Sequence, residues 1–182
     1  MAKNMIRQEI IDNLPEISIM GMNAIENEYV NGWIKYALQY AKDYNNSNEV
    51  GIMLNKSNWN IYDIVVGKEN YVKYNIPECK EERNGNLILI HNHPSNHIFS
   101  DRDIYNFCKT QAVNVLIAAG NKGSIYALQE LRKFDKYKMV ECYLKETDKN
   151  KSIWSREKIF DHVLHEYQSV LNVHYVKEKM TC

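Results

Sequence analysis

The sequence lacks the features that mark several large classes of protein. Its 23 lysine and arginine residues are balanced by 23 aspartate and glutamate residues, so no excess of positive charge favours binding to nucleic acid. No apolar run approaches the roughly 18 residues of a membrane-spanning helix, and residues 1–7 lack the apolar core of a signal peptide. We therefore expect neither a membrane segment nor clear nucleic-acid binding.

The cysteines show no pairing that would indicate a structural site. Cys79, Cys108, Cys142 and Cys182 are scattered, and no C-x-x-C pair is present. We expect free thiols in a reducing compartment, and hence a cytoplasmic protein without a cysteine-based zinc site. No P-loop, Rossmann glycine fingerprint or nucleophile elbow is found either. The sequence therefore does not indicate a P-loop nucleotide-binding protein, a Rossmann dinucleotide-binding protein or an α/β-hydrolase.

Length and composition are typical of one globular unit. The chain has 182 residues, of which 45% are hydrophobic and 25% are charged, enough for a sizeable core. We expect an N-terminal arm over residues 1–25, a main domain over residues 26–130, and a C-terminal extension over residues 131–182. The extension is expected to end in a helix and to pack on the same domain.

Hydrophobic periodicity predicts an α/β fold, with a mixed sheet flanked by helices. Apolar residues recur at intervals of three and four along residues 26–44, as they do on one face of a helix. Shorter apolar runs bounded by turn residues predict strands. The predicted strands cover residues 17–22, 49–54, 60–66, 70–75, 87–93, 113–119, 124–128 and 138–144, and further helices cover residues 101–111 and 154–173.

The most informative segment follows an apolar run that begins at residue 87 and reads His91-Asn92-His93-Pro94 at its end. Side chains two residues apart on a strand point the same way. His91 and His93 can therefore direct their imidazoles at a single ion while Asn92 faces away. Pro94 cannot donate to a sheet, so the strand is expected to stop there and the chain to turn.

A Ser-x-x-Asp element, Ser100 to Asp103, follows at the start of a predicted helix. Asp103 in the first helical turn can return a carboxylate toward the two histidines. Two histidines, one carboxylate and an open fourth position describe a catalytic zinc site better than a structural one. The simpler interpretation is a helix cap, with Ser100 at the N-cap and Asp103 three residues later in a capping-box arrangement. Capping and ligation do not exclude each other.

This pattern resembles the JAB/MPN family, also called the JAMM metalloproteases. Its hallmark is an upstream glutamate, then H-x-H-P, then S-x-x-D. The resemblance implies zinc ligands at His91, His93 and Asp103, with Ser100 at the family's conserved serine. The segment His-Asn-His-Pro-Ser most resembles the motif of the bacterial and phage branches, including RadC-like proteins. The expected fold is a curved mixed sheet with a helix on each side.

Two positions of the family pattern, the upstream glutamate and the aspartate ligand, require an assignment in this sequence. The upstream glutamate is assigned to Glu49, in Asn-Glu-Val-Gly before an apolar run. Nine residues separate His93 from Asp103, one fewer than is usual in the family, and Asp101 is the alternative ligand. The deletion falls in the loop at residues 95–99, where a change of length is more easily absorbed than in a strand.

The resemblance implies a zinc-dependent hydrolase that uses one Zn²⁺ to cleave a peptide or isopeptide amide bond. Glu49 would move the proton of the attacking water, and Ser100 would donate to the oxyanion. The substrate would be a protein or peptide, and a ubiquitin-like target is one possibility. Two alternatives stay open: a non-catalytic JAB-like scaffold or phage assembly module, and a RadC-like protein of DNA metabolism. The sequence does not determine the oligomeric state.

Overall fold

The computed structural model describes residues 4–69, 71–74, 85–110, 112–131 and 136–180. Its centre is a six-stranded mixed sheet with the order β2-β1-β3-β4-β5-β6. All neighbouring strands are antiparallel except β3 and β4, which run parallel. The strands are β1 (Val50–Asn55), β2 (Ile61–Val66), β3 (Leu87–His93), β4 (Val113–Gly120), β5 (Ser124–Glu130) and β6 (Val173–Lys179).

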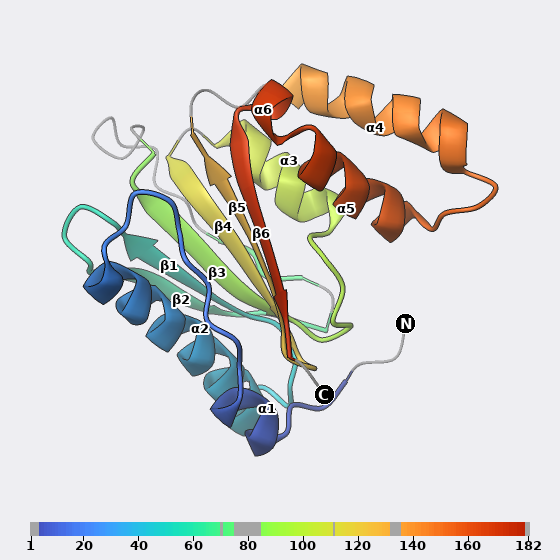
Figure 1. Ribbon diagram of the computed structural model, residues 1–182. Coiled ribbons are helices and arrows are strands. Elements are labelled where there is room, and N and C mark those ends of the chain that lie inside the picture. Colours follow the sequence, from blue (N-terminus) through green and yellow to red (C-terminus); the bar gives the residue numbers. More distant parts are fainter. Residues whose placement is uncertain (1–3, 70, 75–84, 111, 132–135, 181–182) are drawn as a thin grey trace.

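Helices cover both faces of this sheet (Figure 1). On one face lies α2, with the short α1 beside it, and on the other lie α3, α4, α5 and α6. The helices are α1 (Gln8–Asp12), α2 (Ala24–Tyr44), α3 (Asp101–Lys109), α4 (Lys136–Asn150), α5 (Arg156–Glu166) and α6 (Gln168–Leu171). The prediction of a mixed sheet flanked by helices is confirmed. None of the described helices combines the length and apolar character needed to cross a bilayer.

Helix α2 forms where the periodicity predicted it, and it is stabilised both by its own N-terminal residues and by packing on the sheet. A capping box closes its start, because Asn23 accepts from the Glu26 N–H while the Glu26 carboxylate accepts from the Asn23 N–H. Its apolar stripe then packs on the sheet. The buried members of that stripe are Val30, Ile34, Ala37, Leu38 and Ala41.

Strand β3 is buried on both faces, and its alternation decides where the histidines lie. Leu87 and Leu89 pack into the core beneath α3, α4 and α5, whereas Ile88 and Ile90 pack into the core beneath α2. Because side chains alternate along a strand, His91 and His93 continue the row of Leu87 and Leu89. Both histidines therefore face the side of the sheet on which α3 begins.

Several predicted elements are confirmed with boundaries shifted by up to two residues: the helices over residues 26–44 and 101–111, and the strands over 49–54, 60–66, 87–93, 113–119 and 124–128. The last two of these strands pair with each other as an antiparallel hairpin. The strand expected over residues 17–22 is wrong. That segment is irregular, and its backbone is held instead by the side chains of Asn31 and Asn27 on α2, at the N–H groups of Ile17 and Ile19.

The strand expected near residues 70–75 is also absent from the described residues 71–74, where Tyr71 makes only an isolated bridge to Lys68, and residues 70 and 75 lie outside the described part. The strand expected over 138–144 is wrong, because those residues belong to α4. Met139, Cys142 and Glu146 are buried at intervals of three and four, so the buried face of the segment is helical.

The predicted C-terminal helix over 154–173 is correct only in part. It divides into α5 and α6, and Asn172 then adopts a left-handed conformation with φ of 57° that ends the helix. The C-terminal extension was expected to end in a helix, and this is wrong: its last described element is β6, which pairs along its length with β5. Residues of the C-terminal extension thus share a sheet with those of the main domain.

Candidate metal centre and adjoining pocket

The two histidines of the motif lie at the end of β3, as the alternation requires. His91 is fully buried and His93 is 5% exposed. The strand ends at His93, before Pro94, and the chain turns with the Asn96 N–H donating to the His93 carbonyl at 3.0 Å. The predicted stop at Pro94 is thereby confirmed, and the loop of residues 94–100 leads directly to α3.

The start of α3 aims a carboxylate back at the histidines. Ser100 is the N-cap, and its hydroxyl oxygen accepts from the Asp103 N–H at 3.2 Å. In return, Asp103 Oδ2 accepts from the Ser100 N–H at 2.7 Å and from the Ser100 hydroxyl at 2.6 Å. This capping box fixes the side chain of Asp103, so the local chemistry that begins the helix also orients the carboxylate.

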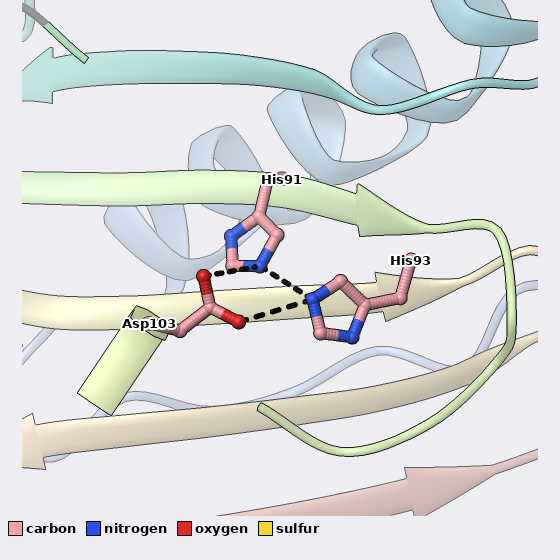
Figure 2. Close-up of side chains that lie close together, drawn as sticks. All are labelled: His91, His93 and Asp103. Atoms are coloured by element: carbon pink, nitrogen blue, oxygen red, sulfur yellow. Dashed lines mark hydrogen bonds and ion pairs between the residues drawn. The ribbon is translucent and has the colours of Figure 1, made fainter. Parts of the chain in front are cut away.

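The three predicted ligands converge (Figure 2). The Nε2 atoms of His91 and His93 lie 2.9 Å apart. Asp103 Oδ2 lies 3.2 Å from the Nε2 of His93, and Oδ1 lies 3.6 Å from that of His91. All the ligand atoms lie within 4.8 Å of one another, and no other such group of His, Cys, Asp and Glu is found among the described residues. Asp101, the alternative ligand, is exposed and stands outside this group.

The hydrogen bonds indicate which imidazole atoms are free to bind a cation. His93 Nδ1 lies 2.9 Å from the carbonyl oxygen of His97, a contact in which only a protonated Nδ1 can donate. A neutral His93 then presents the lone pair of Nε2 to the centre of the group. Fixing the tautomer through the outer nitrogen is the arrangement commonly seen in metal-binding histidines.

The titration behaviour of the group reflects its burial and its charges. Burial lowers the pKa of His93, but the hydrogen bond and charge of Asp103 outweigh burial and raise that pKa overall. For His91, burial dominates and the pKa falls. Burial alone would raise the pKa of Asp103, yet the two histidines together lower it strongly. In the metal-free protein, Asp103 is therefore ionised and a proton is held most readily by His93.

If neither Nε2 atom carried a proton, the two imidazole nitrogens and the carboxylate would repel one another at these separations. The group therefore needs either a proton on the Nε2 of His91 or His93, shared by hydrogen bonding, or a metal ion among its atoms. The set of two histidines and one carboxylate suits zinc. One feature fits less well: Nδ1 of His91 is buried without a hydrogen-bond partner among the described residues, so its proton in the metal-bound tautomer has no acceptor there.

Glu49 precedes β1 and comes close to this group through the register of the sheet. Gly51 pairs with His91 across the antiparallel β1–β3 ladder, so Glu49 lies opposite His93, just beyond the last pair. Its backbone is fixed by the Lys68 carbonyl and the Gly67 N–H. Burial is the main cause that raises the pKa of Glu49 to about 8, with His93 opposing the shift and Asp103 adding to it.

A pocket of about 350 Å³ adjoins the triad. Its lining includes the predicted residues Glu49, His93 and Ser100. It also includes residues from helices that sequence reasoning did not connect with the site: Tyr143 of α4, and Arg156, Glu157 and Phe160 of α5. The structure thus brings together all five predicted site residues and adds a wall that no local motif indicated.

The backbone around Glu49 is also held by an amide between the two histidines. The side chain of Asn92, which faces away from the two histidines as predicted, accepts from the Val50 N–H at 2.7 Å. Its amide nitrogen donates to the Asn48 carbonyl at 3.2 Å and to Asn121 Oδ1 at 2.8 Å. Asn92 therefore links the strand of His91 and His93 to the residues on either side of Glu49.

No protein-family model, curated protein or solved structure matches the chain. The assignment of a function therefore rests on the geometry of the site and on the motif in the sequence.

Proposed function

We propose that the protein is a zinc-dependent hydrolase of the JAB/MPN type that cleaves a peptide or isopeptide amide bond. The observation that carries the proposal is the convergence of two buried imidazole nitrogens and one carboxylate beside a buried glutamate, at the edge of a pocket. Buried titratable groups gathered at a cleft are typical of catalytic sites.

His91, His93 and Asp103 are the residues that would hold the ion. Three protein ligands leave one coordination position open, which distinguishes catalytic from structural zinc sites. Zinc held there would act as a Lewis acid and would lower the pKa of a water that it binds to about 7. Because Ser100 holds Asp103 through two hydrogen bonds, the carboxylate is oriented before any ion arrives.

Glu49 is the proposed general base and acid. It accepts a proton from the attacking water and transfers it to the leaving nitrogen. Burial raises its pKa to about 8, close enough to neutral pH that both the acid and the carboxylate are accessible forms. A group that is not firmly held in either protonation state is suited to moving a proton in both directions.

Ser100 has a defined place in this mechanism. Its hydroxyl donates to Asp103, so it orients the carboxylate that would bind the ion. Donation to the oxyanion, the role that the resemblance implies, requires the hydroxyl to rotate toward the pocket that Ser100 lines. The order glutamate, two histidines, serine, aspartate along the chain, together with a mixed sheet covered on both faces, supports the JAB/MPN-like assignment.

A second candidate function is a non-catalytic JAB-like scaffold. The observation that favours it is that Asp103 already pairs with His93 at 3.2 Å, so a proton on His93 alone can satisfy the group. In that case the triad is a buried ion pair that joins β3 to α3 and has no role in hydrolysis.

Elemental analysis of protein purified without a metal-affinity tag tests the proposal. We expect about one zinc per chain in the wild type, and loss of that zinc in His93→Ala. His165→Ala is the matched control, because the side chain of His165 is 70% exposed on α5. Glu49→Gln should keep the zinc and lose hydrolysis of a panel of peptide and isopeptide substrates. Absence of zinc after zinc is supplied would favour the scaffold.

A further inference from the structure

We propose that the pocket beside the triad is a subsite for one large apolar side chain, belonging to the amino-acid residue that adjoins the cleaved bond. The inference rests on the proposed function, and it names the substrate class as peptides with an aromatic or branched aliphatic residue at that position. It is carried by the apolar residues that line the pocket together with Glu49 and His93.

The apolar residues that line the pocket come from three separate elements. Ile98 and Phe99 lie in the loop between β3 and α3, Phe160 lies on α5, and Tyr143 lies on α4. The rings of Tyr143 and Phe160 meet edge to face with centroids 5.9 Å apart. Because these rings also belong to the core or pack against it, their positions are fixed by packing as well as by each other.

The pocket is held open by contacts between the ligand loop and α5. Nδ1 of His97 lies 2.5 Å from Oε2 of Glu157, and the Ile98 N–H donates to Oε1 of the same carboxylate at 3.4 Å. One glutamate in the first turn of α5 thus fixes two consecutive residues of the loop that connects the ligands. A side chain that enters a pocket formed in advance binds with little cost for ordering the protein.

The charges around the pocket disfavour an acidic substrate side chain. Glu69 and Asp101 line the pocket, and both are exposed and lack an ion-pair partner among the described residues. The lining contributes one guanidinium, that of Arg156. Two free carboxylates against one guanidinium give an excess of negative charge at the rim. A charged side chain would also lose its hydration against Ile98, Phe99 and Phe160, which offer no compensating hydrogen bond.

The volume sets the size of the occupant. About 350 Å³ is near the lower end of the range for small-molecule pockets, which is roughly 300–1,000 Å³. A cavity of this size accommodates one large side chain with its flanking peptide groups. Contact with the surface of a folded protein would require additional residues outside the pocket.

Binding of blocked single amino acids tests the inference without requiring turnover. The probes are the N-acetyl amides of phenylalanine, leucine, alanine and aspartate, titrated by NMR into wild-type protein with and without zinc. We expect the phenylalanine and leucine probes to bind about tenfold or more tightly than the alanine probe, and the aspartate probe to bind most weakly. Nuclear Overhauser effects from the phenylalanine ring should reach Tyr143 and Phe160.

Substitution locates the binding. Tyr143→Ala should reduce affinity for the phenylalanine probe several-fold, whereas Tyr137→Ala, at a 78% exposed position on the same helix, should not. Equal affinity for all four probes, or a phenylalanine probe without contacts to the pocket wall in the wild type, would overturn the inference even if a variant fails to fold. Selective binding with no hydrolysis in the presence of zinc would instead refute the proposed function and leave the subsite established.

Discussion

Asn92 provides the sharpest test of how the candidate site is built, because its side chain joins the strand of His91 and His93 to the segment that contains Glu49. It is fully buried, and its amide makes three hydrogen bonds, to Val50, Asn48 and Asn121, at 2.7, 3.2 and 2.8 Å. Asn121 in turn donates to the carbonyls of Asn4 and Ser47. A buried amide network therefore lies directly behind the candidate metal centre.

Asn92→Ala removes all three bonds and leaves partners unsatisfied in the interior. A neutral hydrogen bond contributes about 1 kcal/mol net, and a buried group left without a partner costs about 1–3 kcal/mol. Val50 is fully buried, so its N–H loses its acceptor without access to water. We expect the free energy of unfolding to fall by on the order of 3–5 kcal/mol, a large fraction of the stability of a single domain.

Asn92→Asp is nearly isosteric and gives a second measurement. The carboxylate keeps an acceptor for the Val50 N–H but places a negative charge against the Asn48 carbonyl and Asn121 Oδ1, where the amide donated. We expect this variant to be at least as unstable as the alanine variant, because a buried charge facing acceptors costs more than a missing bond. Shape alone therefore does not rescue the site.

Urea unfolding of metal-free protein measures both effects as a change in midpoint at constant slope. Asn13→Ala is the control, since that exposed side chain makes one bond, to the Glu9 carbonyl. It should change stability by less than about 0.5 kcal/mol. A loss below about 1 kcal/mol in Asn92→Ala would refute the argument that this amide holds the segment. Where the variant stays folded and binds zinc, displacement of Glu49 should still lower kcat.

Three further predictions concern the metal, the pH and the end of β4. Free zinc at 100 times its Kd should stabilise the wild type by about 2.7 kcal/mol and raise its Tm by roughly 5–10 °C; a scan of His93→Ala should show no zinc-dependent rise, and an equal rise there would contradict the ligand assignment. The folded-state pKa of Glu49 is raised from 4.5 to about 8, so the metal-free protein should lose stability as the pH rises through that window. Urea midpoints between pH 5 and pH 8 should fall less steeply in Glu49→Gln, and identical slopes would show that Glu49 titrates normally. At Gly120, an added Cβ would lie 2.1 Å from Asn96 Oδ1 and 2.5 Å from Ser124 Oγ, so Gly120→Ala should lower the melting temperature; Gly32→Ala, which meets nothing within 4 Å, should raise it slightly, and the reverse order would be inconsistent with this packing.

Elements and site residues could be predicted from the sequence where the local pattern and the tertiary environment agree. Leu87 to Ile90 are apolar on both faces because both faces of β3 are covered, and Pro94 ends the strand by its own chemistry. The same alternation placed His91 and His93 on one face. Asp103 could be placed near them because Ser100 marks the start of a helix, and a capping box has a fixed local geometry.

The failures occurred where distant contacts outweigh local pattern. Residues 136–150 are highly charged, so the buried spacing of Met139, Cys142 and Glu146 was obscured by solvated lysines and glutamates. Strand β6 was missed because only Val173 and Tyr175 are clearly buried, and its pairing with β5 supplies the remaining stabilisation. β propensity depends on such neighbours more than on the segment itself.

The residues of α4 and α5 that line the pocket could not be predicted from the sequence for the same reason. Glu157 contacts His97 across 60 residues of chain, and no motif connects them. Tyr143 and Phe160 appear in the sequence as ordinary apolar positions of helices, which is how most such residues are used. Only the packing of α4 and α5 over the ligand loop shows that they also line a pocket beside Glu49.

The capping box at Ser100 and Asp103 does not by itself account for the triad, and a comparison within the chain shows why. The Asn23–Glu26 box starts α2 equally well, yet its residues are not surrounded by buried imidazoles. At α3, two histidines occupy positions that continue the row of Leu87 and Leu89, where apolar side chains would be stable without any partner. Burying two imidazoles instead, with Nδ1 of His91 unsatisfied, opposes folding. Stability alone therefore gives no reason for His91 and His93, whereas the proposed role in binding a cation would account for both and for the direction in which the cap aims Asp103.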